Sequence, residues 1–356
     1  MSKFIVSLLS LCFLLSSCEN MTEKELEDTI SSGVVLVQNQ SYYEVVLSNG
    51  ESIFFSSFDA EGDLDGLALD KDSVEVSTSY GTGFFISGTG EIVTNSHVVS
   101  NVVADKEVNK QVGKVIEALK AMIEMKYRDY EEKLETAQEA YDYANVNPEV
   151  TYEEFFQIRD IRDAIKKEME EYAQIYNNLD QIRASDSEIK YYNEVSIAYN
   201  NTYVTNTKDF VPCVVTKTDM EHDLAIIQLK DKSTPLGKYV FQVDETDPLE
   251  TYGWREQLEK RISKDKNSEL FMTSFNLGPK LAITKEGIKS QFNHGSISQK
   301  THEKLMYSIP SLPGSSGSPV VNLRGQLVAI NYAGINGTQN FNYGVRVKYL
   351  RELLNK

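Results

Sequence analysis

The sequence predicts a β-strand protein into which a long pair of helices is inserted. Over most of the chain, short runs rich in β-branched and aromatic residues alternate with turns that contain Gly or Asn. Between residues 105 and 182, however, apolar residues recur at steps of three and four, the period of an α-helix. Asn147-Pro148 divides this region, because proline disfavours helix for the residue before it. We therefore expect two antiparallel helices that form a hairpin, with strands on both sides.

The clearest strand signals lie on either side of these helices. The runs 42–47 and 52–58 flank an Asn49-Gly50 turn and predict a β-hairpin. An acidic, glycine-containing stretch follows at 59–72. Its carboxylates do not follow the D-x-D-x-D-G spacing of a calcium loop, so a solvated loop is the simpler interpretation, although a calcium loop is conceivable.

Three short stretches carry side chains suited to acyl transfer. Residues 81–99 predict two strands joined by a Gly-rich turn, ending with His97 at the edge of an apolar strand. Asp223 opens the apolar run 224–229, and Ser316 lies in a glycine-flanked turn. A serine hydroxyl is a weak nucleophile, so it needs a base within hydrogen-bond reach and N–H donors for the oxyanion. Taken singly, these residues are ordinary: a histidine among apolar residues is usually packed in a core, and an Asp before a strand is usually a turn residue.

The order of the three motifs is more specific than any one of them. T-N-S-H-V-V, H-D-L-A-I-I and G-S-S-G-S-P follow one another in this chain. In this it resembles the trypsin-like (chymotrypsin-fold) serine peptidases, and in particular their bacterial HtrA-like and glutamyl-endopeptidase-like branches. The resemblance implies that His97 is the general base, Asp223 its orienting acid and Ser316 the nucleophile, with the N–H groups of Gly314 and Ser316 as the oxyanion hole. It implies neither cofactor nor metal.

The same resemblance implies the architecture: an all-β double six-stranded β-barrel with the antiparallel helical hairpin inserted in the first barrel. We expect no C-terminal PDZ domain, because the chain continues for only about forty residues after Ser316. The expected segments are a signal peptide (1–18), an acidic tether or frayed helix (19–31), the first part of barrel one (32–104), the helical hairpin (105–190), the rest of barrel one (191–240), and barrel two with a C-terminal helix (241–356).

The substrate pocket of this family is formed by residues before the nucleophile and by two later strands. This predicts a pocket near Pro310, Asn331, Tyr332, Gly344 and Arg346. Asn331 stands where the glutamyl endopeptidases have a histidine, which argues against glutamate specificity. If Arg346 points inward, it favours an acidic side chain before the scissile bond. If it points to solvent, it is a charge at a strand edge.

The N-terminus reads as a secretory signal, with one Lys, a short apolar run and then Leu-Ser-Ser-Cys. This ending resembles a bacterial lipobox, so we expect Cys18 to carry lipid and to anchor the chain in the bacterial cell envelope. The alternative is an ordinary signal peptide with a chance cysteine. If Cys18 is lipidated, Cys213 is the one cysteine besides it in the mature chain, and no disulfide between free thiols can form.

The net charge of −17 disfavours nucleic acid and anionic membrane surfaces as partners. Residues 105–190 contain 21 acidic and 13 basic residues, a net charge of −8. We interpret the hairpin either as a solvated, self-packed projection or as an arm that docks a protein partner or gates substrate. The function predicted is therefore that of a serine endopeptidase acting on proteins or peptides. The rival is an inactive scaffold that presents the hairpin to an envelope partner, and an esterase or transacylase with the same triad is also compatible.

Overall fold

The computed structural model describes residues 21–101, 103–204, 206–249, 269–334 and 341–356. The predicted signal peptide and Cys18 lie outside these residues. The described chain forms two compact units. Of the residues described, the first draws on those within 21–41, 78–101 and 193–356, and the second on those within 42–77 and 103–192.

The first unit contains a six-stranded barrel built from both sides of the helical insertion. Its strands, in order around the barrel, are β1 (Val34–Val46), β5 (Ser77–Phe85), β6 (Glu91–Thr94), β9 (Leu224–Leu229), β8 (Val211–Asp219) and β7 (Glu188–Tyr199). Pairing of β1 with β7 closes the barrel, and β2 (Ser52–Phe55) adds to the outer side of β1.

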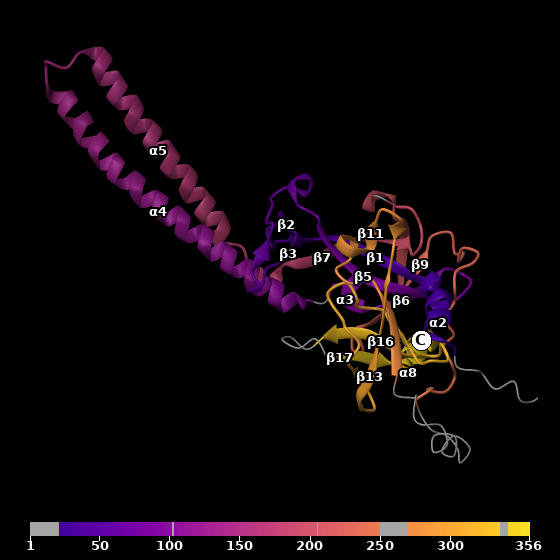
Figure 1. The fold of residues 1–356 in the computed structure, drawn as a ribbon. Coiled ribbons are helices and arrows are strands. Elements are labelled where there is room, and N and C mark those ends of the chain that lie inside the picture. Colours follow the sequence, from indigo (N-terminus) through magenta and orange to yellow (C-terminus); the bar gives the residue numbers. More distant parts are fainter. Residues whose placement is uncertain (1–20, 102, 205, 250–268, 335–340) are drawn as a thin grey trace, which may run out of the picture. The chain divides into compact units, whose positions relative to one another are not determined.

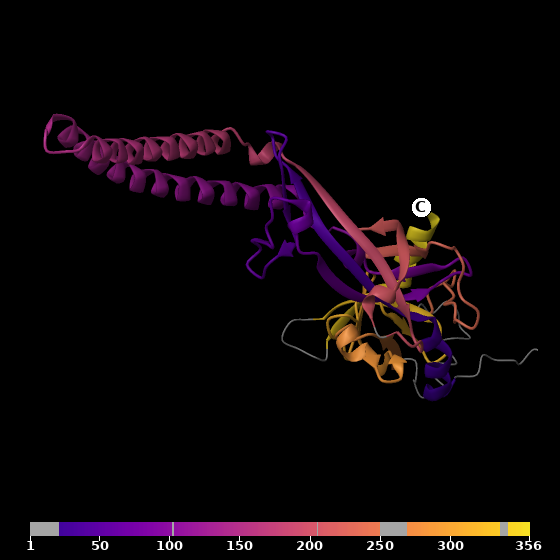
Figure 2. The ribbon, with the colours of Figure 1, turned by 90° about the horizontal axis from the view of Figure 1, so that it is seen from above.

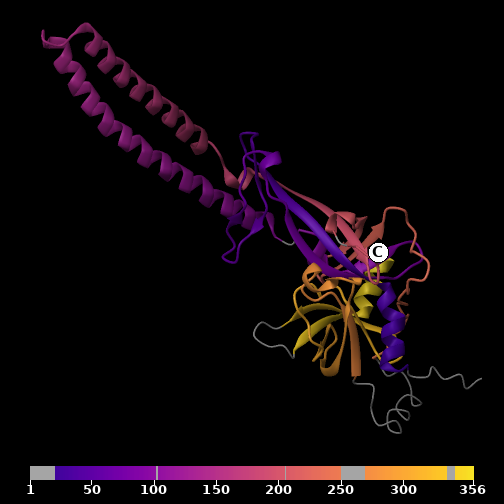
Figure 3. The same ribbon diagram turned by 45° about the horizontal axis from the view of Figure 1, so that its top comes forward.

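A second closed barrel follows in the same unit (Figure 3). Its strands, in order, are β10 (Glu269–Ser274), β13 (Gln291–Lys300), β14 (Lys304–Tyr307), β17 (Asn342–Arg346), β16 (Leu327–Gly334) and β15 (Pro319–Val321). The short helix α7 (Pro279–Ala282) and the two-residue strands β11 (Ile283–Thr284) and β12 (Gly287–Ile288) lie between β10 and β13. The predicted double six-stranded barrel is confirmed.

Uninterrupted apolar runs become strands here because both faces of those strands are buried. In β9, Ala225 and Ile227 enter the core of the first barrel, whereas Leu224 and Ile226 join a second cluster that also holds Phe271 from β10. Successive side chains of a strand point to opposite faces, so one run serves both cores. Burying each such aliphatic side chain contributes about 1.5 to 3 kcal/mol.

Two helices pack on this second cluster, and one of them corrects the sequence-based prediction. The predicted tether 19–31 is in part a helix, α2 (Glu23–Ile30), which begins with a capping box at Thr22. Leu26 and Ile30 are four residues apart, lie on one face and are fully buried, so this segment is docked. The predicted C-terminal helix is present as α8 (Val347–Asn355).

The second unit is organised around the predicted hairpin at Asn49-Gly50. Tyr43 of β1 pairs and stacks with Phe55 of β2, with ring centroids 4.5 Å apart. Both rings share a core with apolar residues from the first turns of α4 (Asp105–Val146), namely Val108, Val112 and Ile116. The expected barrel segment 32–104 therefore includes residues 42–77, which the structure assigns to this unit. The short strands β3 (Ser57–Phe58) and β4 (Leu64–Asp65) complete it.

The predicted helical hairpin is formed by α4 and α5 (Tyr152–Asp180), which run side by side in views at right angles to each other (Figures 1 and 2). A capping box between Thr151 and Glu154 starts α5. Tyr130 and Tyr172 meet across the pair, and Lys120 pairs with Asp180 at 2.7 Å. Among the described residues, no helix combines the length and the apolar character needed to span a membrane.

Candidate active site

His97 lies on a single helical turn, α3 (Ser96–Val99), and not at a strand edge as the sequence suggested. Val98 and Val99 are buried in the core of the first barrel and anchor the turn. The side chain of His97, between these anchors and Ser96, is 37% exposed. The imidazole is thus presented to solvent on a turn that is anchored in the core.

Asp223 holds the imidazole and the backbone of His97 together. Its Oδ2 lies 2.7 Å from His97 Nδ1, and its Oδ1 accepts the backbone N–H of His97 at 2.9 Å. Its own carbonyl accepts a hydrogen bond from Asn95 Nδ2 at 2.7 Å. Asp223 has φ +53°, which is uncommon for a residue with a side chain. The predicted acid therefore reaches the predicted base from the turn before β9.

The Ser316 loop needs its flanking glycines because it approaches the first barrel closely. Gly314 and Gly317 have φ +97° and +87°. A Cβ atom at Gly317 would lie 2.1 Å from the carbonyl oxygen of Thr82, so no other residue fits there.

Thr82 joins this loop to the first barrel, a role that the sequence alone did not reveal. Its N–H donates to the carbonyl of Ser316 at 2.8 Å, and its hydroxyl donates to the carbonyl of Gly314 at 2.8 Å. The same hydroxyl accepts the N–H of Phe275, from the end of β10, at 3.0 Å. Thr82 stands between Gly81 and Gly83 in the sequence, which gives no sign that its partners lie more than 190 residues away.

Ser316 and the His97 turn meet at Gly81. A Cβ atom at this glycine would lie 2.7 Å from a methyl group of Val98 and 3.2 Å from the carbonyl oxygen of Ser316. Among the described residues, no hydrogen bond joins the hydroxyl of Ser316 to His97. Catalytic hydrogen bonds are often long in ligand-free enzymes and tighten when substrate binds.

The predicted oxyanion hole has free donors. Among the described residues, the N–H groups of Gly314 and Ser316 have no acceptor, as an oxyanion hole requires.

Asn331, predicted to line the pocket, is buried against the nucleophile loop. Its Nδ2 lies 3.0 Å from the carbonyl oxygen of Ser315, 3.1 Å from the hydroxyl of Ser315 and 3.2 Å from that of Ser311. Its Oδ1 accepts the Tyr307 hydroxyl at 2.7 Å. Burial raises the pKa of Tyr307 well above its usual value, so this phenol stays protonated and donates. Gly344 pairs with Asn331 in the sheet, and a Cβ atom at Gly344 would lie 2.8 Å from the Cβ of Ala329 and 3.1 Å from the Tyr307 ring.

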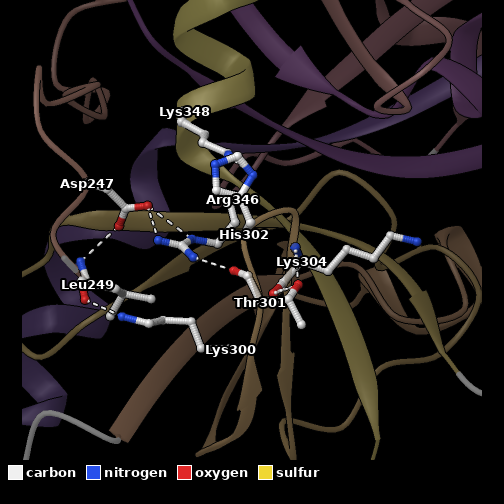
Figure 4. A network of polar contacts seen from close by, with 8 residues as sticks. All are labelled: Asp247, Leu249, Lys300, Thr301, His302, Lys304, Arg346 and Lys348. Atoms are coloured by element: carbon white, nitrogen blue, oxygen red, sulfur yellow. Dashed lines mark hydrogen bonds and ion pairs between the residues drawn. The ribbon is translucent and has the colours of Figure 1, made fainter.

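Arg346 is neither a free cation nor a surface charge. Its side chain is 3% exposed and forms a salt bridge with Asp247, which is itself buried (Figure 4). Nη1 also donates to the carbonyl of Thr301 at 2.7 Å. Because Asp247 compensates the guanidinium, the idea of a pocket cation that selects acidic substrates loses its basis, and so does the strand-edge alternative.

The other two predicted pocket residues are Pro310 and Tyr332. Pro310 is exposed. Tyr332 is half-buried, with the ammonium of Lys304 5.2 Å from its ring centroid. In the described parts of the chain, no group of three or more His, Cys, Asp and Glu side chains could hold a metal ion.

Comparison with known proteins agrees with this geometry. Residues 182–330 match the family model described as a trypsin-like peptidase domain. The match includes Asp223 and Ser316, and His97 lies before it. It spans less than half of the chain and begins directly after α5.

No curated protein sequence matches the chain. One similar solved structure is the serine endoprotease from Yersinia pestis, with a TM-score of 0.43 and 12% sequence identity. The alignment covers 94% of this chain and 66% of that protein, so this chain spans less than two thirds of its length. The fold assignment rests on the strand pairing described above and not on this likeness.

Proposed function

We propose that this trypsin-like peptidase domain acts as a serine endopeptidase through His97, Asp223 and Ser316. The contact of 2.7 Å between His97 Nδ1 and Asp223 Oδ2 carries the proposal. A carboxylate at Nδ1 favours the tautomer with its proton there, which leaves the lone pair of Nε2 as the base. The second oxygen of Asp223 holds the backbone of the same residue, so the ring and its supporting turn share one anchor.

The proposed reaction uses each group once in each half-cycle. Ser316 Oγ attacks the substrate carbonyl carbon while its proton passes to His97 Nε2, and the N–H groups of Gly314 and Ser316 bind the oxyanion. Collapse breaks the peptide bond, and His97 gives its proton to the leaving amine. Water then attacks the acyl-enzyme with His97 as base, which releases the acid and restores Ser316.

Kinetics of triad variants test this proposal. We expect Ser316→Ala to lower kcat on a protein substrate by more than about 10³-fold, and Asp223→Asn by about 10⁴-fold with an intact fold. Ser298→Ala is the matched control, because the side chain of Ser298 is exposed on β13 and should not affect cleavage. Retention of cleavage by Ser316→Ala would refute the proposed nucleophile.

We also propose that the chain is lipid-anchored at Cys18 in the bacterial cell envelope. The support is the lipobox-like Leu-Ser-Ser-Cys after a short apolar run. Metabolic labelling with a fatty-acid analogue tests it in cells. We expect labelling and membrane association in the wild type, and loss of both in Cys18→Ala. Equal labelling of the two proteins would exclude this anchor.

We further infer that the helical pair docks a positively charged protein surface. Residues 131–163, around the connection between α4 and α5, contain 10 acidic and 3 basic residues, a net charge of −7. Apolar side chains are exposed in the same region, with Val146 78% and Tyr152 85% exposed. Apolar side chains surrounded by charge of one sign suit an oppositely charged protein partner.

A further inference from the structure

The turn that carries Asp223 is fastened to the C-terminal helix α8. Asp219, at the end of β8, accepts the backbone N–H groups of Glu221 and His222 at 3.1 and 3.2 Å, and lies 3.1 Å from the ring Nδ1 of His222. The side chain of Asp219 is only 5% exposed. These contacts close the Asp219–Asp223 turn around one buried carboxylate.

Helix α8 contacts this turn and the adjoining strand at three points. The ring of His222 stacks on the ring of Tyr349, with centroids 3.8 Å apart and planes inclined by 19°. Lys356 Nζ lies 3.2 Å from Asp219 Oδ2. Lys217 of β8 donates from Nζ to the carbonyl of Leu354 at 2.8 Å, which caps the C-terminal end of the helix. Because Tyr349 is buried in the large core cluster, it is a firm base for the imidazole.

On its other side the same turn contacts the segment that carries His97. The hydroxyl of Ser96 lies 2.9 Å from the sulfur of Met220. Asn95 donates to the carbonyl of Asp223, and the carboxylate of Asp223 accepts the N–H of His97. A continuous series of contacts therefore runs from α8 through the turn to α3, entirely within the first unit.

The conformation of Asp223 explains why this turn needs support. Its φ of +53° is the left-handed conformation, which persists for a residue with a side chain only when its surroundings enforce it. If the turn relaxes, the carboxylate moves away from His97 Nδ1. A displacement of about 1 Å at a catalytic group can cost about 100-fold in rate.

We propose that His222 is a positioning residue that uses its stack on Tyr349 to hold Asp223 in the conformation that orients His97. The inference rests on the proposed triad, since it assigns His222 a function through that triad. His222 itself touches neither His97 nor Ser316 among the contacts of the described residues. The proposal gives α8 a function in catalysis besides its contribution to the core.

Substitutions at His222 separate the stack from the hydrogen bond. His222→Ala removes both. His222→Phe keeps a ring on Tyr349 and leaves Asp219 with two backbone N–H donors and Lys356. His302→Ala is the matched control, because His302 also contacts α8, through Lys348, but from the β13–β14 turn (Figure 4).

Two measurements read the result. With a peptide substrate, we expect His222→Ala to lower kcat by about 10- to 100-fold, with KM changed by less than about two-fold, because orientation of the base is lost and not substrate binding. We expect His222→Phe to restore kcat to within about three-fold of the wild type and His302→Ala to match the wild type.

The second measurement is the NMR resonance of the His97 Nδ1 proton in a Ser316→Ala background, which needs no activity. The His97 Nδ1 resonance should be sharp at low field when position 222 holds His or Phe, and broadened or lost when it holds Ala.

The outcomes separate this inference from the proposed function. An unchanged Nδ1 proton in the folded His222→Ala protein would overturn the positioning role, whether or not the wild type cleaves peptides. A protein that shows the predicted NMR change without any peptidase activity would retain the positioning role and refute the proposed function. Loss of kcat in His222→Phe equal to that in His222→Ala would show that the stack is not what positions Asp223.

Discussion

Asn331 fixes the nucleophile loop through both its backbone and its side chain. Its N–H and carbonyl pair with Ser318 and Gly317, and its amide nitrogen reaches Ser315 and Ser311. The residue expected to select substrate thus lies 1% exposed, in a position that shapes the loop.

We predict that Asn331→Ala destabilises the protein and slows cleavage. It removes the acceptor of the buried Tyr307 hydroxyl, which costs about 1 to 3 kcal/mol, whereas the carbonyl of Ser315 keeps its hydrogen bonds from Ser318. Urea unfolding and peptide cleavage measure the two effects. Tyr307→Phe removes the hydrogen bond between Tyr307 and Asn331 and should have a smaller effect. Equal stability of Asn331→Ala and the wild type would contradict this account of the loop.

Arg346 leads to a prediction about specificity and stability together. Breaking a buried ion pair leaves one charge uncompensated, so Arg346→Met should lower the free energy of unfolding by about 3 to 5 kcal/mol. The double variant Arg346→Met with Asp247→Leu should recover most of this loss, since no charge then remains buried. The preference among peptides cleaved after Glu, Leu or Arg should not change between the folded double variant and the wild type. A selective loss of cleavage after Glu would restore the idea of a pocket cation.

For single residues, the sequence indicates which side chains form the candidate site, but it indicates less about the residues that hold them in place. His97 and Asp223 follow from motifs of a few residues, because the required side chains are adjacent to recognisable strands. Thr82 and Asn331 act through hydrogen bonds to carbonyls in other segments. Such bonds require no particular partner residue type, so they leave no pattern in the sequence.

The turn between β8 and β9 is an element whose stability should depend on pH. Burial raises the pKa of Asp219, but hydrogen bonds from the His222 ring, the His222 N–H and Lys356 lower it by more, so the net pKa is below its usual value. A carboxyl with a lowered folded-state pKa stabilises the fold above its unfolded pKa of about 3.9, and this contribution is lost as the pH falls through the folded-state pKa.

Accordingly, Asp219→Asn should lower the free energy of unfolding by about 1 to 3 kcal/mol at pH 7. The difference from the wild type should shrink as the pH falls below about 4. Denaturant unfolding across this range measures it. A difference that stays constant with pH would show that the ionised carboxylate is not what supports the turn.

The helical pair is an element that can be shortened without touching its attachment. Residues Val108, Val112, Ile116, Leu179 and Ile182 join the core of the second unit, whereas residues 131–163 lie beyond this core. We predict that replacing 131–163 by a short flexible linker leaves folding and cleavage of small peptides unchanged. Binding of a cationic protein such as lysozyme, which depends on salt, should weaken by more than about 10-fold.

The control for this deletion is a variant of the same segment that carries three fewer negative charges. Glu149→Gln, Glu153→Gln and Asp142→Asn keep the helices and remove exposed acidic groups. Reduced binding by this variant as well would support charge as the cause. Undiminished binding by the shortened protein would exclude the segment as the docking surface.

At the scale of the whole molecule, the class of fold was predictable and its division into units was not. Helical periodicity, a proline break and the strand signals predicted inserted helices within a β-protein, and the strand order confirms the two barrels. The assignment of residues 42–77 to the helical unit could not be foreseen. β1 runs unbroken from Val34 to Val46 through the boundary between the units, and the packing of Phe55 on α4 joins segments about fifty residues apart.

The α2 segment was misjudged for a related reason. Four acidic residues dominate its composition, but the fate of a short helix depends on two apolar residues on one face and on whether a core accepts them. Leu26 and Ile30 find such a core among strands that are distant in sequence. The acidic composition of α2 predicts a solvated segment, but the burial of Leu26 and Ile30 keeps the helix packed on the core.

The central claim, that Ser316 is an activated nucleophile, is tested most directly with a fluorophosphonate probe. The account predicts stoichiometric labelling of the folded wild-type protein at Ser316, and loss of labelling in Ser316→Ala and His97→Ala, with Ser298→Ala labelled like the wild type. Absence of labelling in the folded wild type, with and without a cationic protein bound to the helical pair, would contradict it.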